Sequence, residues 1–354
     1  MPPPVSLTHC VPQVLCVGEI LVDLLADQPG SISDVNRSWT PYPGGAPANV
    51  ACGLVKLGTP AAFIGCVGVD GPGQQLLAFL QAHQVNVTGV QRHAHAPTRR
   101  VYVTRSEAGD RTFAGFGDDD PHAFADTQLQ AADLPEALFH GADYLVLGTL
   151  ELAYPDSAQA LHRALKLAQQ YQVKVALDVN WRSAFWSDPI QAKSTILDII
   201  PQAHYLKLSH EEADWLFETG DPTTIADRLP HAQGVLVTAG AKGCAYSLGA
   251  HVGQVPAFAV KGVDTTGAGD AFLAGFLHQL CAQGETCLST SAAIAATVTY
   301  ANAVGALTVT QLGAIAAQPT AAEVAAFLAN PPTLLSLPCS RSRDETSSVY
   351  KPHP

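Results

Sequence analysis

The segment GVDTTGAGDAFLAGF, residues 262–276, carries the strongest structural signal in the chain. Gly267 and Gly269 flank Ala268, and Asp270 follows directly before an apolar, periodic run. This pattern predicts a glycine-rich turn into a helix, whose amides at the positive end of the helix dipole can bind an anion. A carboxylate beside an anion site is useful if it must also meet a proton donor, such as an alcohol that attacks phosphorus. The alternative is that Asp270 is an ordinary helix N-cap.

Short apolar runs alternate with helical patterns along the rest of the chain. The expected buried strands are Val14–Val17, Ala61–Val67, Tyr144–Leu147, Val173–Leu177, His204–Leu208 and Val235–Thr238. The expected helices are Ala48–Leu57, Gln74–His83, Pro155–Tyr171, Glu211–Glu218 and Ala271–Cys281. This alternation predicts an α/β fold in which helices cover both faces of a parallel sheet.

Two stretches, residues 24–42 and 99–116, do not follow this alternation. Both are rich in turn residues and alternating patterns, such as RRVYVTRSEAGDRTFAGF. We expect them to form hairpin strands outside the main sheet, in a lid. The Pro-rich start, 1–12, and the end, 331–354, lack core periodicity and are expected to be flexible tails around one domain, 13–330.

The composition narrows the range of partners and compartments. The chain has 354 residues and a formal net charge of −12, which argues against nucleic acid or an anionic membrane surface as the main partner. Its eight cysteines are dispersed, with neither CxxC nor zinc spacing, as is typical of a reducing compartment. The N-terminus has neither the basic nor the apolar region of a signal peptide. We therefore expect a cytoplasmic protein.

One long stretch, Thr286–Ala322, contains no Asp, Glu, Lys or Arg. Its length would allow it to span a bilayer, but its Ala, Thr, Ser, Gly and Asn content is too weakly apolar for lipid. We interpret it as a small-residue helix in a tightly packed core, followed by a loop.

Two further segments carry polar groups that a ligand could meet. In YPGGAPANVACGLVKLG, residues 42–58, Gly44 and Gly45 allow close backbone approach and Asn49 can donate to or accept from hydroxyls, unless this is a plain helix start. In GEILVD, Asp23 is expected at the end of a buried strand, where α/β sheets bind ligands, unless it is merely solvated there. No GxxxxGK[ST] motif is present, so a nucleotide would not be held by a Walker A loop.

Together, GEILVD, GGAPAN and DTTGAGDAF resemble the ribokinase-like (PfkB-type) carbohydrate kinase family in their order and separation. The resemblance covers roughly residues 13–330, and DTTGAGD is its most specific part. It implies a doubly wound, mostly parallel sheet with helices on both faces, and a small β-sheet lid over the sugar. The two irregular stretches match that lid.

The resemblance also implies a role for each matching residue. Asp270 falls on the family's catalytic base, and the family's anion hole falls on Gly267, Ala268 and Gly269. The positions that contact the sugar in the family fall on Asp23, Gly44, Gly45 and Asn49.

The resemblance implies nucleotide-binding residues in the same way. The segment LVTAGAKG, residues 236–243, is similar to the nucleotide loop, which implicates Thr238 and Gly240. Asn302 falls where the family places a residue against adenine, so ATP is the implied phosphoryl donor. The loop that holds a monovalent cation such as K⁺ through backbone carbonyls falls on Asp264 and Thr266.

One element departs from the family pattern. The Asn-x-x-Glu element reads SHEE here, so Glu212 is kept and Ser209 replaces the Asn. Glu212 could orient the water shell of Mg²⁺, and serine still donates a hydrogen bond to a phosphate. We therefore expect altered nucleotide affinity without loss of activity, and fructokinases of this family often carry that serine.

The segments GGAPANVA and LDVNWR resemble the fructokinase branch, in which Arg182 could balance phosphate charge. The expected reaction is therefore the phosphorylation of fructose to fructose 6-phosphate, and kinases of ribose or 2-keto-3-deoxygluconate are the alternatives. A non-catalytic sugar-sensing homologue is disfavoured, because Asp270 and its glycines are retained. Lids of this family sometimes pair, so a homodimer through the lid is also expected.

Overall fold

The computed structural model describes residues 11–332 except 29–37, 106–110, 118 and 187. Almost all of the two tails expected at 1–12 and 331–354 lies outside the described residues. Among the residues that are described, no helix combines the length and apolar character needed to cross a membrane.

The main sheet has nine strands in the order β13-β12-β11-β10-β9-β8-β1-β4-β5. The strands from β5 to β11 along this order are parallel, and β12 and β13 are antiparallel additions at one edge. Their bounds are β1 Val14–Val17, β4 Ala61–Gly68, β5 Asn86–His93, β8 Tyr144–Leu147, β9 Lys174–Asp178, β10 Tyr205–Ser209, β11 Gly234–Thr238, β12 Cys244–Leu248 and β13 His251–Val255. The chain runs outward from β1 in both directions, so the predicted doubly wound α/β fold is confirmed.

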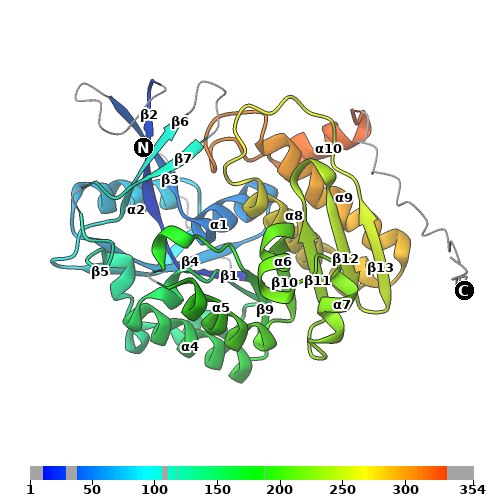
Figure 1. Ribbon diagram of the computed structural model, residues 1–354, viewed down its shortest axis with the longest axis horizontal. Coiled ribbons are helices and arrows are strands. Elements are labelled where there is room, and N and C mark those ends of the chain that lie inside the picture. Colours follow the sequence, from blue (N-terminus) through cyan, green and yellow to red (C-terminus); the bar gives the residue numbers. More distant parts are fainter. Residues whose placement is uncertain (1–10, 29–37, 106–110, 118, 187, 333–354) are drawn as a thin grey trace, which may run out of the picture.

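Helices cover both faces of this sheet (Figure 1). Strand β1 shows why: Val14 and Cys16 belong to one buried cluster, and Leu15 and Val17 belong to the other. The first cluster packs under α1 Ala46–Leu57, α2 Gly71–Ala82, α8 Ala268–Gln283, α9 Ser291–Thr308 and α10 Ala321–Ala329. The second packs under α3 Glu136–Phe139, α4 Pro155–Gln170, α5 Pro189–Ile199, α6 His210–Phe217 and α7 Pro222–Asp227.

The charge-free stretch contains α9, as expected from its small residues. Helix α9 packs closely on α8, and a Cβ added at Gly275 of α8 would lie 2.9 Å from a methyl carbon of Val304. The small side chains therefore allow two buried helices to approach each other.

A separate four-stranded sheet has the order β3-β2-β6-β7 and lies apart from the main sheet, at the upper left in Figure 1. Its strands are β2 Leu21–Ala26, β3 Trp39–Gly44, β6 Arg100–Arg105 and β7 Arg111–Gly115. The two predicted hairpins outside the main sheet are thus confirmed. One expectation was wrong: Asp23 lies within lid strand β2, because the buried strand β1 already ends at Val17.

Candidate functional site

A polar cavity of about 630 Å³ lies between the lid, the ends of β10 and β11, and the start of α8. An apolar cavity of about 440 Å³ adjoins it and shares Thr238, Thr265 and Gly269 with it. Eleven of the predicted site residues line the polar cavity: Asp23, Gly45, Asn49, Arg182, Ser209, Glu212, Thr238, Thr266, Gly267, Gly269 and Asp270. The structure therefore gathers most of the predicted site from segments far apart in the sequence.

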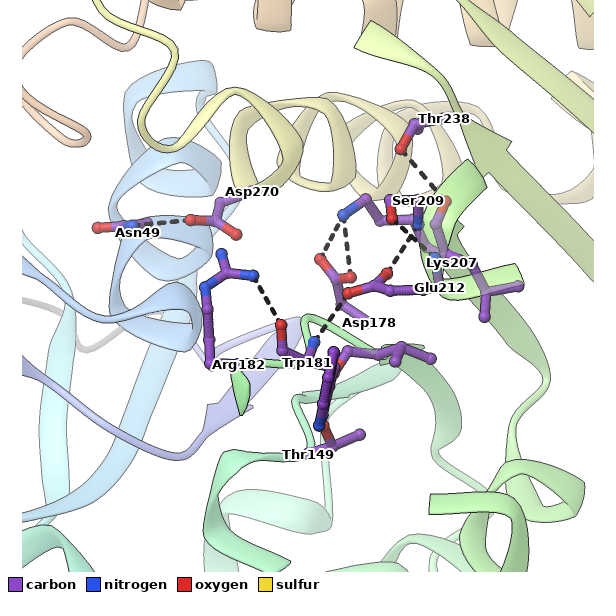
Figure 2. A network of polar contacts seen from close by, with 12 residues as sticks. Asn49, Thr149, Asp178, Trp181, Arg182, Lys207, Ser209, Glu212, Thr238 and Asp270 are labelled. Atoms are coloured by element: carbon purple, nitrogen blue, oxygen red, sulfur yellow. Dashed lines mark hydrogen bonds and ion pairs between the residues drawn. The ribbon is translucent and has the colours of Figure 1, made fainter. Parts of the chain in front are cut away.

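Asp270 is the third residue of α8, and it is not the helix N-cap. The N-cap is Gly267, whose φ of 76° is in the left-handed region that favours glycine. The Asp270 side chain instead accepts a hydrogen bond of 2.7 Å from the Asn49 amide (Figure 2). Burial, and then the negative charge of Asp178, raise the pKa of Asp270. A carboxylate that is buried, held in one orientation and not used to cap the helix is well suited to accept a proton.

The turn before α8 presents backbone amides at the cavity, of which that of Ala268 also donates to the Thr265 carbonyl oxygen at 3.3 Å. The first amides of a helix have no partner within the helix and lie at the positive end of its dipole. Gly267 and Gly269 line the polar cavity, and Ala268 and Gly269 line the apolar one. An anion that bridges the two cavities would therefore meet this helix start.

Gly44 and Gly45 are required by close packing around Asp23 and Glu19. A Cβ at Gly44 would lie 2.5 Å from a carboxylate oxygen of Asp23. Gly45, with φ of 105°, is the N-cap of α1, and a Cβ there would lie 2.5 Å from the backbone oxygen of Glu19. These contacts explain why both positions lack side chains beside Asp23 and Asn49.

Ser209 and Glu212 form a capping box at the start of α6. The Glu212 amide donates to the Ser209 hydroxyl oxygen, and the Ser209 amide donates to the Glu212 carboxylate at 2.7 Å. The other Glu212 oxygen accepts from the Trp181 amide at 2.8 Å. The Ser209 hydroxyl hydrogen is not used in the box, and the Glu211 carboxylate would compete with a ligand in the cavity for it.

A buried ion pair with one member at this cavity was missed by the sequence reasoning. Lys207 of β10 and Asp178 of β9 form a buried ion pair with nitrogen–oxygen distances of 2.9 and 2.7 Å. Lys207 lines the polar cavity. The one signal in the sequence was a lysine inside the apolar run expected to be a strand.

A second buried polar cluster is formed by Glu19 and Glu151. Glu19 lines the cavity, and one of its oxygens accepts from the Ala46 amide at 2.7 Å. Burial raises the pKa of Glu19 to about 7. Burial also raises the pKa of Glu151, and the charge of Glu19 raises it further. Two neighbouring carboxyls in this setting hold a proton near neutral pH.

The apolar cavity is lined by the predicted nucleotide residues Thr238, Gly240 and Asn302, together with Ala268 and Phe272. The Asn302 amide nitrogen donates to the backbone oxygens of Val255 and Pro256, both at 3.2 Å. This fixes the Asn302 side chain on the wall of the cavity. The cavity is apolar enough for a base and opens toward the helix start that suits phosphates.

The predicted cation loop is held by one carboxylate. Asp264 accepts from the Thr266 amide at 3.1 Å and from the Gly313 amide at 2.9 Å. The side chain of Asp264 therefore shapes the loop, and a cation there would be held by backbone carbonyls. Thr266 lines the polar cavity next to the start of α8.

Known proteins resemble the chain along most of its length. The family model described as pfkB family carbohydrate kinase matches residues 11–321. The probable fructokinase-3 of Arabidopsis thaliana is 32% identical over 318 residues, which cover 89% of this chain and 91% of that protein. Fructokinase-1 of rice (Oryza sativa subsp. japonica) is 34% identical over 316 residues, 88% of this chain and 96% of that protein.

Solved structures show the same similarity. The fructokinase of Xylella fastidiosa with bound ATP has a TM-score of 0.81 and 29% identity, covering 89% of this chain and 98% of its own. A double mutant of the Vibrio cholerae O395 fructokinase, with fructose, ADP and potassium bound, has a TM-score of 0.78 and 32% identity, covering 91% and 99%. The chain therefore belongs to the pfkB family of carbohydrate kinases and is a phosphotransferase that acts on a sugar.

Proposed function

We propose that this chain is an ATP-dependent fructokinase that transfers the γ-phosphoryl group of ATP to the primary hydroxyl of fructose, giving fructose 6-phosphate. One observation carries the proposal: Asp270, the start of α8 and the lid residue Asp23 all line one polar cavity. The adjoining apolar cavity is lined by the residues predicted to bind a nucleotide. The named relatives are fructokinases, and the Vibrio cholerae structure contains fructose and ADP.

The arrangement assigns a task to each group. Asp23, Asn49 and the backbone at Gly45 would bind sugar hydroxyls, with Gly44 bare so that Asp23 fits. Asp270 would accept the proton of the attacking hydroxyl, and its hydrogen bond to Asn49 orients it toward the sugar end. The amides at Gly267–Gly269 would stabilise charge on the transferring group.

The nucleotide would lie across both cavities. Asn302 and Gly240 would contact the base and ribose end, and Thr238 and Ser209 would contact phosphates from the shared wall. Arg182 lies near Asp270, where its positive charge would balance phosphate charge (Figure 2).

Mg²⁺ fits this set of groups. The polar cavity is lined by the carboxylates Glu212 and Asp270, and each carboxylate oxygen of Glu212 has a lone-pair site beyond its backbone bond. Held through water by Glu212, the bound ion would neutralise charge on the phosphates. A monovalent cation would order the turn from the carbonyls of the Asp264–Thr266 loop.

An ADP-release assay with fructose, ribose, glucose, adenosine and 2-keto-3-deoxygluconate tests the proposal. Fructose should give the highest kcat/KM of the five. A higher value for ribose or 2-keto-3-deoxygluconate would overturn the fructose assignment, and no turnover with any sugar would favour a sugar-sensing homologue.

A homodimer through the lid sheet is part of the same proposal. Strands β3 and β7 are the edges of that sheet, and an edge strand offers unpaired backbone groups to a second copy. Light scattering should give twice the chain mass of 37.1 kDa. A single-chain mass at assay concentration would rule the dimer out.

A further inference from the structure

Lys207 is almost completely buried, and yet it lines the polar cavity. Its residue exposure is 7%, and both oxygens of Asp178 hold its ammonium group. An ammonium has three N–H donors, and the two bonds to Asp178 use at most two of them. One donor is therefore left for a group inside the cavity.

The ammonium packs directly against the start of α8. A Cβ built on Gly269 would lie 2.9 Å from the Lys207 Nζ and 3.6 Å from its Cε. Figure 2 shows Lys207 extending from β10 toward the space between Asp178 and the first turn of α8. The lysine and the amides of that turn thus border the same part of the cavity.

The local charges keep Lys207 protonated. Burial alone would lower the pKa of its ammonium, but the negative charges of Asp178 and Glu212 raise it above its ordinary value. The charge of Asp270 acts in the same direction. The cavity therefore contains a permanent, desolvated positive charge beside the helix start.

We propose that Lys207 is a further catalytic residue, which binds the transferring phosphoryl group beside the helix amides, and that Asp178 is its positioning residue. This inference rests on the proposed kinase function. In the reaction, the bond from the γ-phosphorus to the bridging oxygen of ADP breaks, and a bond to the sugar oxygen forms. The bond electrons leave with ADP and the hydroxyl proton passes to Asp270, while Lys207 stays protonated throughout.

The competing explanation is purely structural. Lys207 and Asp178 are register partners on the adjacent parallel strands β10 and β9, so the ion pair could simply join these strands. On that explanation the pair would influence folding alone. Removing one partner would be strongly destabilising, because it leaves a buried charge unpaired.

Two variants separate these explanations. Lys207→Met removes the ammonium but leaves Asp178 unpaired, whereas the double variant Lys207→Met/Asp178→Asn removes both charges. The double variant should melt within a few degrees of wild type and still show a kcat about 10²-fold lower, as for loss of one transition-state donor. Its KM for the sugar should change by less than about threefold, because Asp23 and Asn49 are untouched.

The matched control is Lys166→Met, which removes an exposed lysine on α4. Both kcat and melting temperature should be unchanged. If the double variant recovers kcat to within about threefold of wild type, the pair is structural and the proposal is wrong.

A binding measurement separates this inference from the proposed function. Calorimetry without sugar compares ADP with its non-hydrolysable triphosphate relative AMP-PNP, both with Mg²⁺, on wild type and the double variant. If wild type phosphorylates no sugar, the proposed function fails, and binding then decides the role of Lys207. Weaker AMP-PNP binding in the double variant with unchanged ADP binding supports it, and equal losses for both ligands overturn it.

Discussion

The described residues contain two buried ion pairs, Arg99–Asp126 and Lys207–Asp178, and the surroundings of the two pairs differ. Arg99 and Asp126 are 2.5 Å apart, and the rings of Phe116, Phe124, Tyr154 and Phe185 surround the guanidinium at 4.7–5.5 Å. Lys207 and Asp178 are also buried, but the Lys207 ammonium borders the polar cavity. One pair is enclosed by aromatic side chains, and the other faces a site.

Because their surroundings differ, the two buried ion pairs are expected to affect different properties of the protein. Burying an ion pair costs desolvation free energy whether or not a ligand is near. The guanidinium of Arg99 stacks on the surrounding aromatic rings, so its charge is expected to stabilise the folded state. Lys207 lines the cavity, so its charge is expected to stabilise a bound anion. Charges that face the cavity should therefore affect turnover, and enclosed charges should affect stability.

The largest effect is expected from a charge that faces the cavity. Asp270→Asn keeps the shape of the side chain but removes the carboxylate that would take the hydroxyl proton. We expect kcat to fall by at least about 10²-fold, with sugar and ATP affinities within about tenfold of wild type. Steady-state kinetics and calorimetry measure both quantities.

The melting temperature of Asp270→Asn should barely change, since Gly267 is the N-cap of α8. A kcat within about threefold of wild type would show that Asp270 is not the base. It would also remove the contrast between the cavity-facing and the enclosed charges.

The opposite response is expected from the enclosed pair. Arg99→Met leaves the Asp126 carboxylate buried and unpaired, and should lower the free energy of unfolding by about 3 kcal/mol. The kcat of the remaining folded protein should stay close to that of wild type, because neither Arg99 nor Asp126 lines the cavity. Urea titration and kinetics well below the melting temperature measure the two effects.

The neighbouring residue offers a matched control. Arg100 pairs with Asp119 at 2.9 Å, but both side chains are about a third or more exposed, at 41% and 32%. Arg100→Met should therefore cost less than about 1 kcal/mol. Equal losses for the two arginine variants would mean that the aromatic enclosure does not matter.

A smaller effect is expected on the pH dependence of stability, through the buried carboxyl of Glu19. Burial raises the pKa of Glu19 from 4.5 to about 7, so the folded chain holds a proton there that the unfolded chain has released. The resulting stability is present below about pH 4.5 and is lost as pH rises to about 7. Its slope in that window should be about 1 kcal/mol per pH unit.

Glu19→Gln removes this titration and keeps an acceptor for the Ala46 amide. Urea titrations at several pH values across the window should show a flatter dependence in the variant than in wild type. Parallel curves for the two proteins would show that Glu19 titrates as an ordinary exposed carboxyl.

The smallest effect is expected from the cation loop. Asp264 fixes this loop through two backbone amides, and a monovalent cation held by the carbonyls of the loop would add positive charge near the cavity. Activity should be a few-fold higher in potassium than in sodium or choline at equal ionic strength. Equal rates in the three buffers would leave Lys207 and Arg182 as the cavity's fixed positive charges among the described residues.

The sequence was sufficient for the architecture and for much of the site. Apolar runs located six of the seven parallel strands to within one residue, and glycine-rich turns located the start of α8. The parallel strand β5 was missed, because its sequence NVTGVQRH contains no apolar run. The sequence could not show that Lys207 meets Asp178, since that contact depends on strand register between residues 29 apart. It also misplaced Asp23 at the end of a sheet strand, because the break between β1 and β2 has no strong local signal.

Gly269 limits which amino-acid substitutions this site can accept. Its Cα must stay bare both to expose backbone amides and to leave room for the Lys207 ammonium. A methyl group at position 269 would displace the ammonium, and a displaced ammonium would leave Asp178 without its counter-charge. Neighbours of this kind are expected to show strongly non-additive substitution effects. Substitutions at Gly269, Lys207 and Asp178 should therefore be coupled, so that a change at one of them is tolerated better together with a change at its neighbour.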